Sequence, residues 1–127
     1  MPIKFKVIER GQPGVQGGGE KKFYASPVME GEVTLAGLTK AIEKICTVSG
    51  ADIRAVLYAL VDVSIDNLSE GRIIRLGDLG SIRVSLSSEG KATVEEVTAN
   101  AIKGGSVIFT PGIRIKEMLS SVKYQKA

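Results

Sequence analysis

The order of helical and strand patterns in this 127-residue sequence predicts an α+β fold. A strand pair comes first, followed by two helices, three strands and a last helix. Apolar residues alternate with polar ones at 3–7 and 81–86, which is the period of a half-buried strand. They recur every three or four residues at 35–45 and 53–68, which is the period of a helix. We therefore expect one small domain of mixed class with an appendage.

Residues 1–34 differ in character from the rest and are predicted to form an N-terminal strand-pair extension, with residues 35–127 as the main domain. Pro27 interrupts the second strand and favours an edge position, because proline cannot donate a ladder hydrogen bond. The glycine-rich segment 11–19 connects the two strands. It runs into a strand pattern rather than a helix, so we expect a mobile hairpin tip and not a phosphate-binding loop.

Two helices are predicted after this extension. Thr34 is a suitable N-cap for the first, and Ser49-x-x-Asp52 resembles a capping box that opens the second. The second helix is apolar around most of its circumference, and a helix of this kind must be buried on more than one side. Its main stripe consists of Ile53, Val56, Leu57, Leu60, Val61, Ile65 and Leu68. One small chain cannot easily cover it, so the sequence predicts a dimer.

The second half of the chain reads as strands and a closing helix. Gly71 ends the long helix, and a short strand at 72–76 leads through a turn at 77–80 into the strand at 81–86. In that strand Ile82, Val84 and Leu86 are expected on one face, and Arg83 shares the other face with two serines. Residues 93–97 are a further strand candidate within a polar stretch. The remaining elements are a strand at 107–109, a stop at Pro111-Gly112, and a terminal helix carrying Ile115, Met118, Leu119 and Val122.

The residues that are missing exclude several classes of protein. The sequence contains no His and one cysteine, Cys46, which removes the usual general base, zinc clusters and an internal disulfide framework. Cys46 lies in a helical apolar pattern and is predicted to be a buried thiol. Asp62 and Asp66 lie one helical turn apart, a spacing that favours a solvated stripe over an acid–base pair. With no membrane-span-length apolar run and no signal-peptide pattern, we expect a cytoplasmic, non-enzymatic protein without cofactor, metal or small-molecule substrate.

Charge is distributed unevenly along the chain. Residues 1–34 carry +1, residues 35–70 carry −2 and residues 71–127 carry +4, which sum to the net +3. A basic strand region beside a slightly acidic helical part suits contact with a phosphate backbone, although an ordinary solvated surface is the simpler alternative. The basic residues of the last segment are Arg72, Arg75, Arg83, Lys91, Lys103, Arg114, Lys116, Lys123 and Lys126.

Four motifs, in this order, make residues 35–126 resemble the HU/IHF family of bacterial histone-like DNA-binding proteins. They are Leu-Thr-Lys-Ala-Ile at 38–42, the helix end Ser-Glu-Gly at 69–71, the turn Leu-Gly-Asp-Leu-Gly-Ser-Ile at 76–82, and Phe-x-x-Gly-x-x-Ile-Lys-Glu at 109–117. The turn is similar to the Gly-Phe-Gly-Thr/Ser-Phe turn of the family, with Leu79 and Ile82 in place of two aromatics. Residues 1–34 are similar to the extra strand pair of longer HU-like proteins.

The resemblance implies an IHF-like fold: an intertwined homodimer with a helical base and a β-saddle bearing two ribbon arms. It implies a nucleoid-associated architectural protein that binds double-stranded DNA with little sequence preference, mainly through phosphates. The positions it marks as DNA contacts are Arg75, Gly80, Ser81, Arg83 and Lys116. The basic residues Arg72, Lys91 and Lys103 of the strand region are expected to add to them. Candidates for extra contacts are Lys4, Lys6, Lys21 and Lys22. The alternative is that residues 1–34 simply cover a sheet edge.

The predicted arm departs from the family pattern. The arm-tip Arg-Asn-Pro motif is missing between Leu86 and Val107, and Ser85 and Ser87 stand where the family tends to place arginines. The arm also contains three acidic residues, Glu89, Glu95 and Glu96. Proline intercalation is therefore not implied. An alternative stays open, in which the same fold serves as a protein-interaction or assembly module with weak or no DNA binding.

Overall fold

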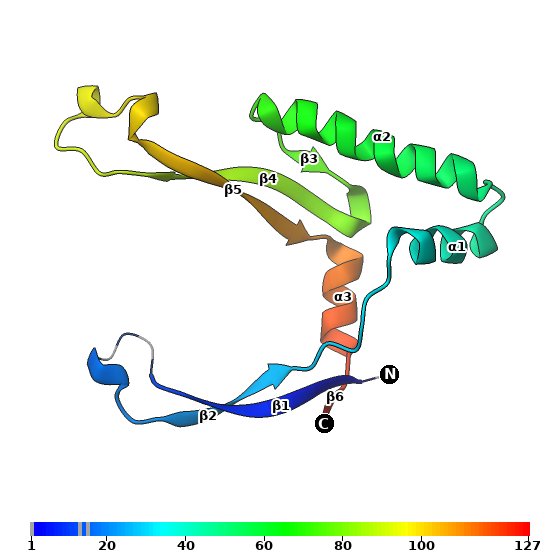
Figure 1. Ribbon diagram of the computed structural model, residues 1–127, viewed down its shortest axis with the longest axis horizontal. Coiled ribbons are helices and arrows are strands. Elements are labelled where there is room, and N and C mark those ends of the chain that lie inside the picture. The colour runs from blue at the N-terminus through cyan, green and yellow to red at the C-terminus, as the bar shows by residue number, and fades with distance from the viewer. Residues whose placement is uncertain (1, 13, 15) are drawn as a thin grey trace. The chain divides into compact units, whose positions relative to one another are not determined.

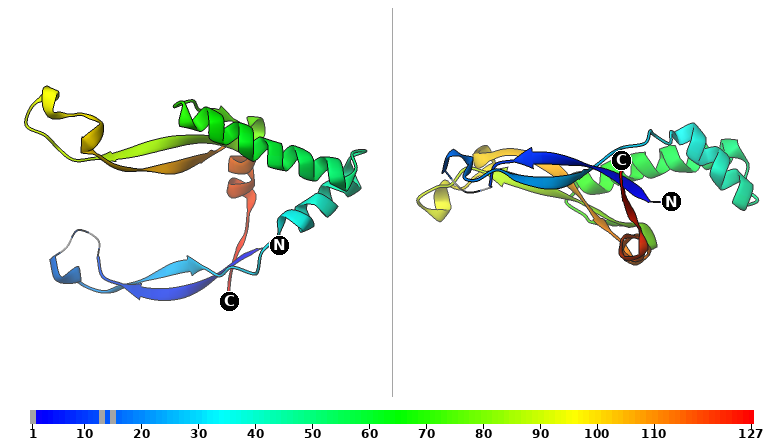
Figure 2. Two further views of the ribbon diagram at one scale, coloured as in Figure 1. Left: turned by 45° about the horizontal axis from the view of Figure 1, so that its top comes forward. Right: turned by 90° about the horizontal axis from the view of Figure 1, so that it is seen from below.

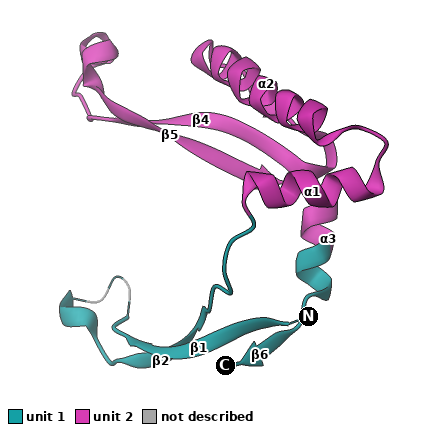
Figure 3. Ribbon diagram, turned by 45° about the vertical axis from the view of Figure 1, so that its right-hand side comes forward, with its two compact units in different colours: residues 1–33, 118–127 teal, residues 34–117 magenta. Residues whose placement is uncertain are grey.

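The computed structural model describes residues 2–12, 14 and 16–127, and its chain divides into two compact units (Figure 3). Unit 1 comprises Met1–Val33 and Met118–Ala127, and unit 2 comprises Thr34–Glu117. The sequence placed residues 118–127 with the main domain, whereas here they group with the N-terminal strands. The structure confirms the mixed α+β class, with three α-helices and two small sheets among the described residues.

Unit 1 is built on a three-stranded sheet with the order β2-β1-β6 (Figure 1). Its strands are β1 (Ile3–Arg10), β2 (Lys22–Pro27) and β6 (Tyr124–Lys126). β2 runs antiparallel to β1 and lies at an edge, as Pro27 predicted, and β6 runs parallel to β1. The sequence did not predict β6. Of the predicted connector 11–19, residues 13 and 15 lie outside the described residues.

The two faces of this sheet differ in chemistry. Residues that pair across neighbouring strands share a face, and successive residues alternate between faces. The face that we call the apolar face contains Ile3, Phe5, Val7, Glu9, Phe23, Ala25, Pro27, Tyr124 and Lys126. The other, the basic face, contains Lys4, Lys6, Ile8, Arg10, Lys22, Tyr24, Ser26 and Gln125.

Unit 2 begins with two helices, α1 (Leu35–Ile45) and α2 (Gly50–Ser69). Both predicted N-caps are confirmed: Thr34 Oγ1 accepts from Gly37 N at 3.2 Å, and Ser49 Oγ accepts from Asp52 N at 3.3 Å. The prediction of a buried Cys46 is wrong, because this thiol is exposed. Cys46 is the C-cap of α1, with extended backbone, so its side chain has left the helical apolar stripe.

The sheet of unit 2 has the order β3-β4-β5 and is antiparallel throughout. Its strands are β3 (Ile74–Arg75), β4 (Gly80–Ser88) and β5 (Ile102–Pro111). β4 and β5 form a long two-stranded hairpin that extends away from the helices (Figure 2). Pro111 and Gly112 end β5 as predicted, and helix α3 (Ile113–Ser121) follows.

The predicted strand at 93–97 is wrong. Short 3₁₀ turns stand at Val94–Glu96 and Ala99–Ala101, where the chain reverses between β4 and β5. Residues in this loop have no neighbouring strand to complete a ladder, so their backbone groups bond locally, as Val97 N does to Val94 O at 3.1 Å. Glu89 N donates to Ala101 O at 2.8 Å and closes the loop.

One copy of the chain has almost no hydrophobic core. Among the described residues, the only buried apolar side chains are Ile53 and Ala101. Much of the predicted stripe on α2 is exposed to solvent, with Val56 at 64% and Val61 at 54% exposure. A chain of this length normally buries most of its apolar surface. The structure therefore agrees that a single copy does not cover α2.

A tight turn between β3 and β4 contacts the residue that precedes α3. The turn at Gly77–Leu79 is closed by hydrogen bonds from Leu76 N to Gly80 O at 2.7 Å and from Gly112 N to Leu79 O at 3.0 Å. Gly80 is buried with φ +145°, and a Cβ there would overlap the Thr110 carbonyl oxygen and the Phe109 ring. Only glycine fits this position.

We predict that Gly80→Ala lowers the free energy of unfolding by more than about 1 kcal/mol, because the new methyl group meets backbone at a left-handed φ. Gly90→Ala is the matched control, since a Cβ at Gly90 meets nothing within 4 Å. Urea unfolding of the two variants measures the difference. Equal midpoints for the two would contradict the packing role of Gly80.

Candidate nucleic-acid interface

The sheet of unit 2 separates polar from apolar side chains. Arg75 pairs with Ser81, Ser81 with Thr110, Arg83 with Ile108, and these partners share one face. The face that we call the Ser/Arg face contains Arg75, Ser81, Arg83, Ser85, Ser87, Ser106, Ile108 and Thr110. The opposite face contains Ile74, Ile82, Val84, Leu86, Val107 and Phe109. The sequence prediction that Arg83 shares a face with two serines is confirmed.

Two guanidinium groups define the chemistry of the Ser/Arg face. Arg75 stands beside Ser81, and Arg83 is two residues farther along β4, so the two arginines are diagonal neighbours about 7–8 Å apart. Both side chains are exposed, and neither belongs to an ion pair within the described part of the chain. A guanidinium binds phosphate oxygens through two parallel hydrogen bonds, and the neighbouring hydroxyl groups are further donors. The face can therefore hold successive phosphates.

The other predicted contacts of unit 2 lie off the centre of this face. Nη1 of Arg72 lies 2.7 Å from Glu70 Oε2 and 2.9 Å from Asn67 Oδ1, so its charge is partly neutralised at the end of α2. Nζ of Lys91 lies 3.2 Å from Glu89 Oε2 in the loop between β4 and β5. Lys103 is the extra residue at a β-bulge opposite Ser87 and Ser88.

The remaining two predicted positions are Gly80 and Lys116. Gly80 starts β4 next to Ser81, and its contact with the Thr110 backbone gives it a packing role in addition to any contact with DNA. Lys116 lies in α3, where its N–H donates to Gly112 O at 3.0 Å and its side chain is exposed. The sheet thus brings Arg75, Gly80, Ser81 and Arg83 together and leaves the other four predicted residues at its margins.

The basic face of unit 1 holds three of the four extra predicted contacts. Lys4 pairs with Glu30 at 3.0 Å, whereas Lys6 and Lys22 are exposed without an ion pair among the described residues. Lys22 stands directly opposite Arg10, a like-charged pair that costs roughly 0.2–1 kcal/mol unless an anion lies between them. Lys21 precedes β2 and is exposed. A phosphate group would relieve the repulsion between Lys22 and Arg10.

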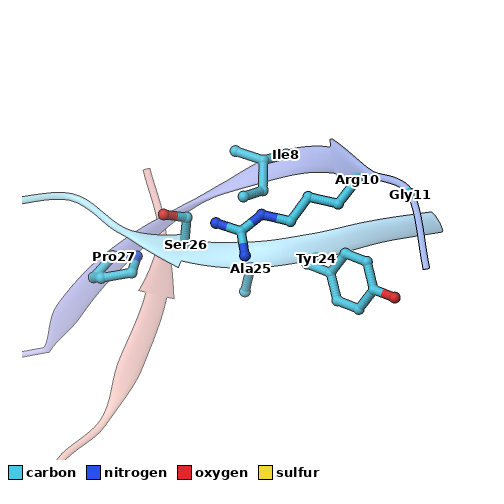
Figure 4. A pocket seen from close by; sticks show the side chains of 7 residues that line it. All are labelled: Ile8, Arg10, Gly11, Tyr24, Ala25, Ser26 and Pro27. Carbon is cyan, nitrogen blue, oxygen red and sulfur yellow. The ribbon is translucent and has the colours of Figure 1, made fainter. Parts of the chain in front are cut away.

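The sequence interpretation missed Arg10. The signal was available, because the alternation that places Lys4 and Lys6 on one face continues to position 10. Figure 4 shows the Arg10 side chain beside Ile8 and Ser26, where these residues line a shallow cavity of about 390 Å³. The cavity is open and shaped by a few side chains, and we assign no bound molecule to it.

We also searched the described residues for metal sites, acid–base pairs and membrane-spanning helices. No group of three or more His, Cys, Asp or Glu side chains stands close enough together to hold a metal ion there. Asp62 and Asp66 are both exposed on α2. None of the helices in the described part of the chain combines the length and hydropathy needed to cross a membrane.

A solved structure has a similar fold. It is that of a protein from Bacteroides vulgatus ATCC 8482 with the provisional name of a bacterial DNA-binding protein, with a TM-score of 0.66 and 13% sequence identity. The similarity covers 98% of this chain and 47% of that one, so this chain spans about half the length of its structural relative. None of the curated proteins compared with the chain matches it.

The family comparison covers nearly the whole sequence. The model named HU-HIG, an HU domain fused to wHTH, Ig, or Glycine-rich motif, matches residues 1–126. This range includes both the helices and sheet of unit 2 and the N-terminal strands. The narrower resemblance to HU and IHF themselves stays a prediction. The chain belongs to the HU-HIG family of HU-like domains.

Proposed function

We propose that the chain is a non-enzymatic, architectural DNA-binding protein that acts as a homodimer and binds duplex DNA with little sequence preference. The observation that carries this proposal is the Ser/Arg face, on which Arg75 and Arg83 stand exposed among hydroxyl groups. Membership in an HU-like family and the provisional name of the structural relative both support DNA as the partner.

The proposed contacts are directed to phosphates rather than to bases. Arginine, lysine and hydroxyl side chains on a sheet position a protein on the duplex without reading its sequence. A net charge of +3 is modest, so the affinity is expected to depend on this local concentration of positive charge. Lys4, Lys6, Lys21 and Lys22 in unit 1 are proposed as additional contacts, and Lys91, Lys103, Lys116 and Arg72 as peripheral ones. Location in the cytoplasm, on the nucleoid, belongs to the same proposal.

The homodimer is proposed from the apolar surface that one copy leaves exposed. The residues on α2 and on the apolar side of the β3-β4-β5 sheet belong to the same unit, and both surfaces carry large side chains with about half of their area exposed. Burying apolar surface contributes about 25 cal/mol per Å², so a second copy that covers α2 would gain substantial stability. An intertwined dimer is the arrangement that the family resemblance implies.

A second candidate function rests on the loop between β4 and β5. Val94 is 85% exposed, Val97 is also exposed, and Glu95 and Glu96 lie between them in the sequence. Carboxylates at this position repel phosphates, whereas exposed valines are suited to contact with another protein. The same fold could thus act as a protein-interaction or assembly module. The absence of any mobility shift with long duplex DNA at low salt would favour this alternative over DNA binding.

We predict that Arg83→Gln weakens binding to duplex DNA and lowers the slope of log affinity against log salt by about 0.9, because one phosphate contact is lost. Arg54→Gln, on α2, is the control and leaves the slope unchanged, since Arg54 lies outside the Ser/Arg face. A salt series of fluorescence-anisotropy titrations measures both. Identical slopes for Arg83→Gln and the wild type would remove Arg83 from the interface.

We predict that Val61→Asp disrupts the association through α2 and lowers the sedimentation coefficient, because a charge placed in a buried apolar interface has no partner. Val61 is 54% exposed in one copy, so the substitution does not disturb packing within that copy. Asp62→Asn, one residue along the same helix, retains the dimer. Sedimentation velocity distinguishes the outcomes, and an unchanged sedimentation coefficient for Val61→Asp would place the dimer interface elsewhere.

A further inference from the structure

The apolar face of unit 1 is an exposed surface that the proposed function does not use. Phe23 is 72% exposed, Tyr124 is 64% exposed and Val7 is 47% exposed on this face. Phe23 is the most exposed aromatic side chain among the described residues. Ile3, Phe5, Pro27 and Tyr124 line a groove of about 420 Å³ on the same side of the sheet. Contiguous exposed apolar surface of this kind marks an interaction site.

Two opposite charges stand on this face, at different levels along the strands. Glu9 pairs with Phe23, and Lys126 pairs with Phe5, which is four residues away along β1. At about 3.3 Å per residue the two levels are separated by roughly 13 Å. Neither charge belongs to an ion pair within the described residues. Every other side chain on the apolar face is uncharged.

We propose that the apolar face packs against the same face of a second copy of the chain, about a twofold axis that passes near Val7. Such an axis lies between the two sheets and runs across the strands, so it exchanges the levels of residues 9 and 5 and keeps each strand over its own counterpart. It places Glu9 of one copy over Phe5 of the other, and Phe23 over Pro27. Each Lys126, one strand away from Phe5, then lies next to a Glu9 carboxylate of the other copy. The exposed Phe23 side chain faces the part of the groove that Pro27 lines.

A second copy is favoured over a partner of one charge. A strongly acidic partner would face Glu9 with a like charge, and a strongly basic partner would do the same to Lys126. Only a surface with the opposite order of charges satisfies both, and a half-turn of the same face supplies that order. Two sheets that stack through apolar faces about 10 Å apart are a common arrangement.

This contact is independent of the proposed DNA-binding function. It uses unit 1 only, whereas the proposed dimer through α2 and the Ser/Arg face both lie in unit 2. The basic face, with Lys6, Arg10 and Lys22, is on the other side of the same sheet and stays open when the apolar faces pair. Self-association through unit 1 would therefore leave those cations available.

Crosslinking of the full chain tests the proposal. In a Cys46→Ser background, Val7→Cys near the axis is treated with a short bis-maleimide crosslinker, and Lys6→Cys on the basic face is the control. We expect a covalent dimer with Val7→Cys and little with Lys6→Cys. Equal yields at the two positions would overturn the proposal, because contact through this face would then be unspecific.

Charge exchange provides the second arm. Glu9→Lys and Lys126→Glu each place like charges together, so each alone is expected to weaken crosslinking at Val7→Cys about tenfold. An equimolar mixture of the two variants restores the yield, because the mixed pair regains both attractions. Failure of the mixture to recover would overturn the paired geometry.

Two further controls separate this contact from folding and from DNA binding. Phe23→Ser lowers the yield, whereas Tyr24→Ser on the opposite face does not, which distinguishes loss of contact from loss of the sheet. Arg83→Gln leaves crosslinking unchanged while it alters DNA binding. The failure of either proposal therefore leaves the other intact.

Discussion

The constraint on which the structure depends is that one copy of the chain buries almost none of its apolar side chains. Ile53 and Ala101 are the only buried apolar residues among those described, although hydrophobic types make up 43% of the sequence. Helix caps and strand ladders give each element its local shape, but they contribute little net stability without burial. A single copy therefore leaves open most of the apolar surface whose burial would stabilise the fold.

In both sheets, apolar and charged side chains lie on opposite faces. A strand presents alternate side chains to opposite faces, so one face can be apolar and the other can carry charge. In unit 2, Arg75 and Arg83 lie on one face, and Val84 and Phe109 lie on the other. In unit 1, Lys6 and Arg10 lie on one face, and Phe5 and Val7 lie on the other. Polar and apolar contacts can therefore use different surfaces of the same sheet.

Local signals predicted well those features whose cause lies within a few residues. The caps at Thr34 and Ser49, the edge position of the strand with Pro27, and the shared face of Arg83 and its serines follow from neighbouring residues, and the structure confirms them. The features that the sequence did not predict depend on where a segment lies in the folded chain. Residues 93–97 include three β-branched residues, which are typical of a strand, but they lie where the chain turns back, without a partner strand.

Position in the folded chain also explains why the exposure of Cys46, the strand β6 and the role of Arg10 were not predicted. Cys46 follows an apolar pattern, yet the helix has already ended there. β6 has three residues with no strong pattern, and its existence depends on pairing with β1. The Arg10–Lys22 juxtaposition requires the register of two strands, which the sequence alone did not specify.

The pairing of β6 with β1 joins parts of the chain that are far apart in sequence. Ile3 lies beside Tyr124, and the backbone hydrogen bond from Ile3 N to Lys123 O is 2.8 Å long. A contact of such high sequence separation forms late in folding, because the loop between its ends must close first. Until that happens, β1 has an unpaired edge next to exposed aromatic side chains. An unpaired strand edge of this kind is prone to pair with another chain, so closure of β6 onto β1 protects the N-terminal sheet from aggregation.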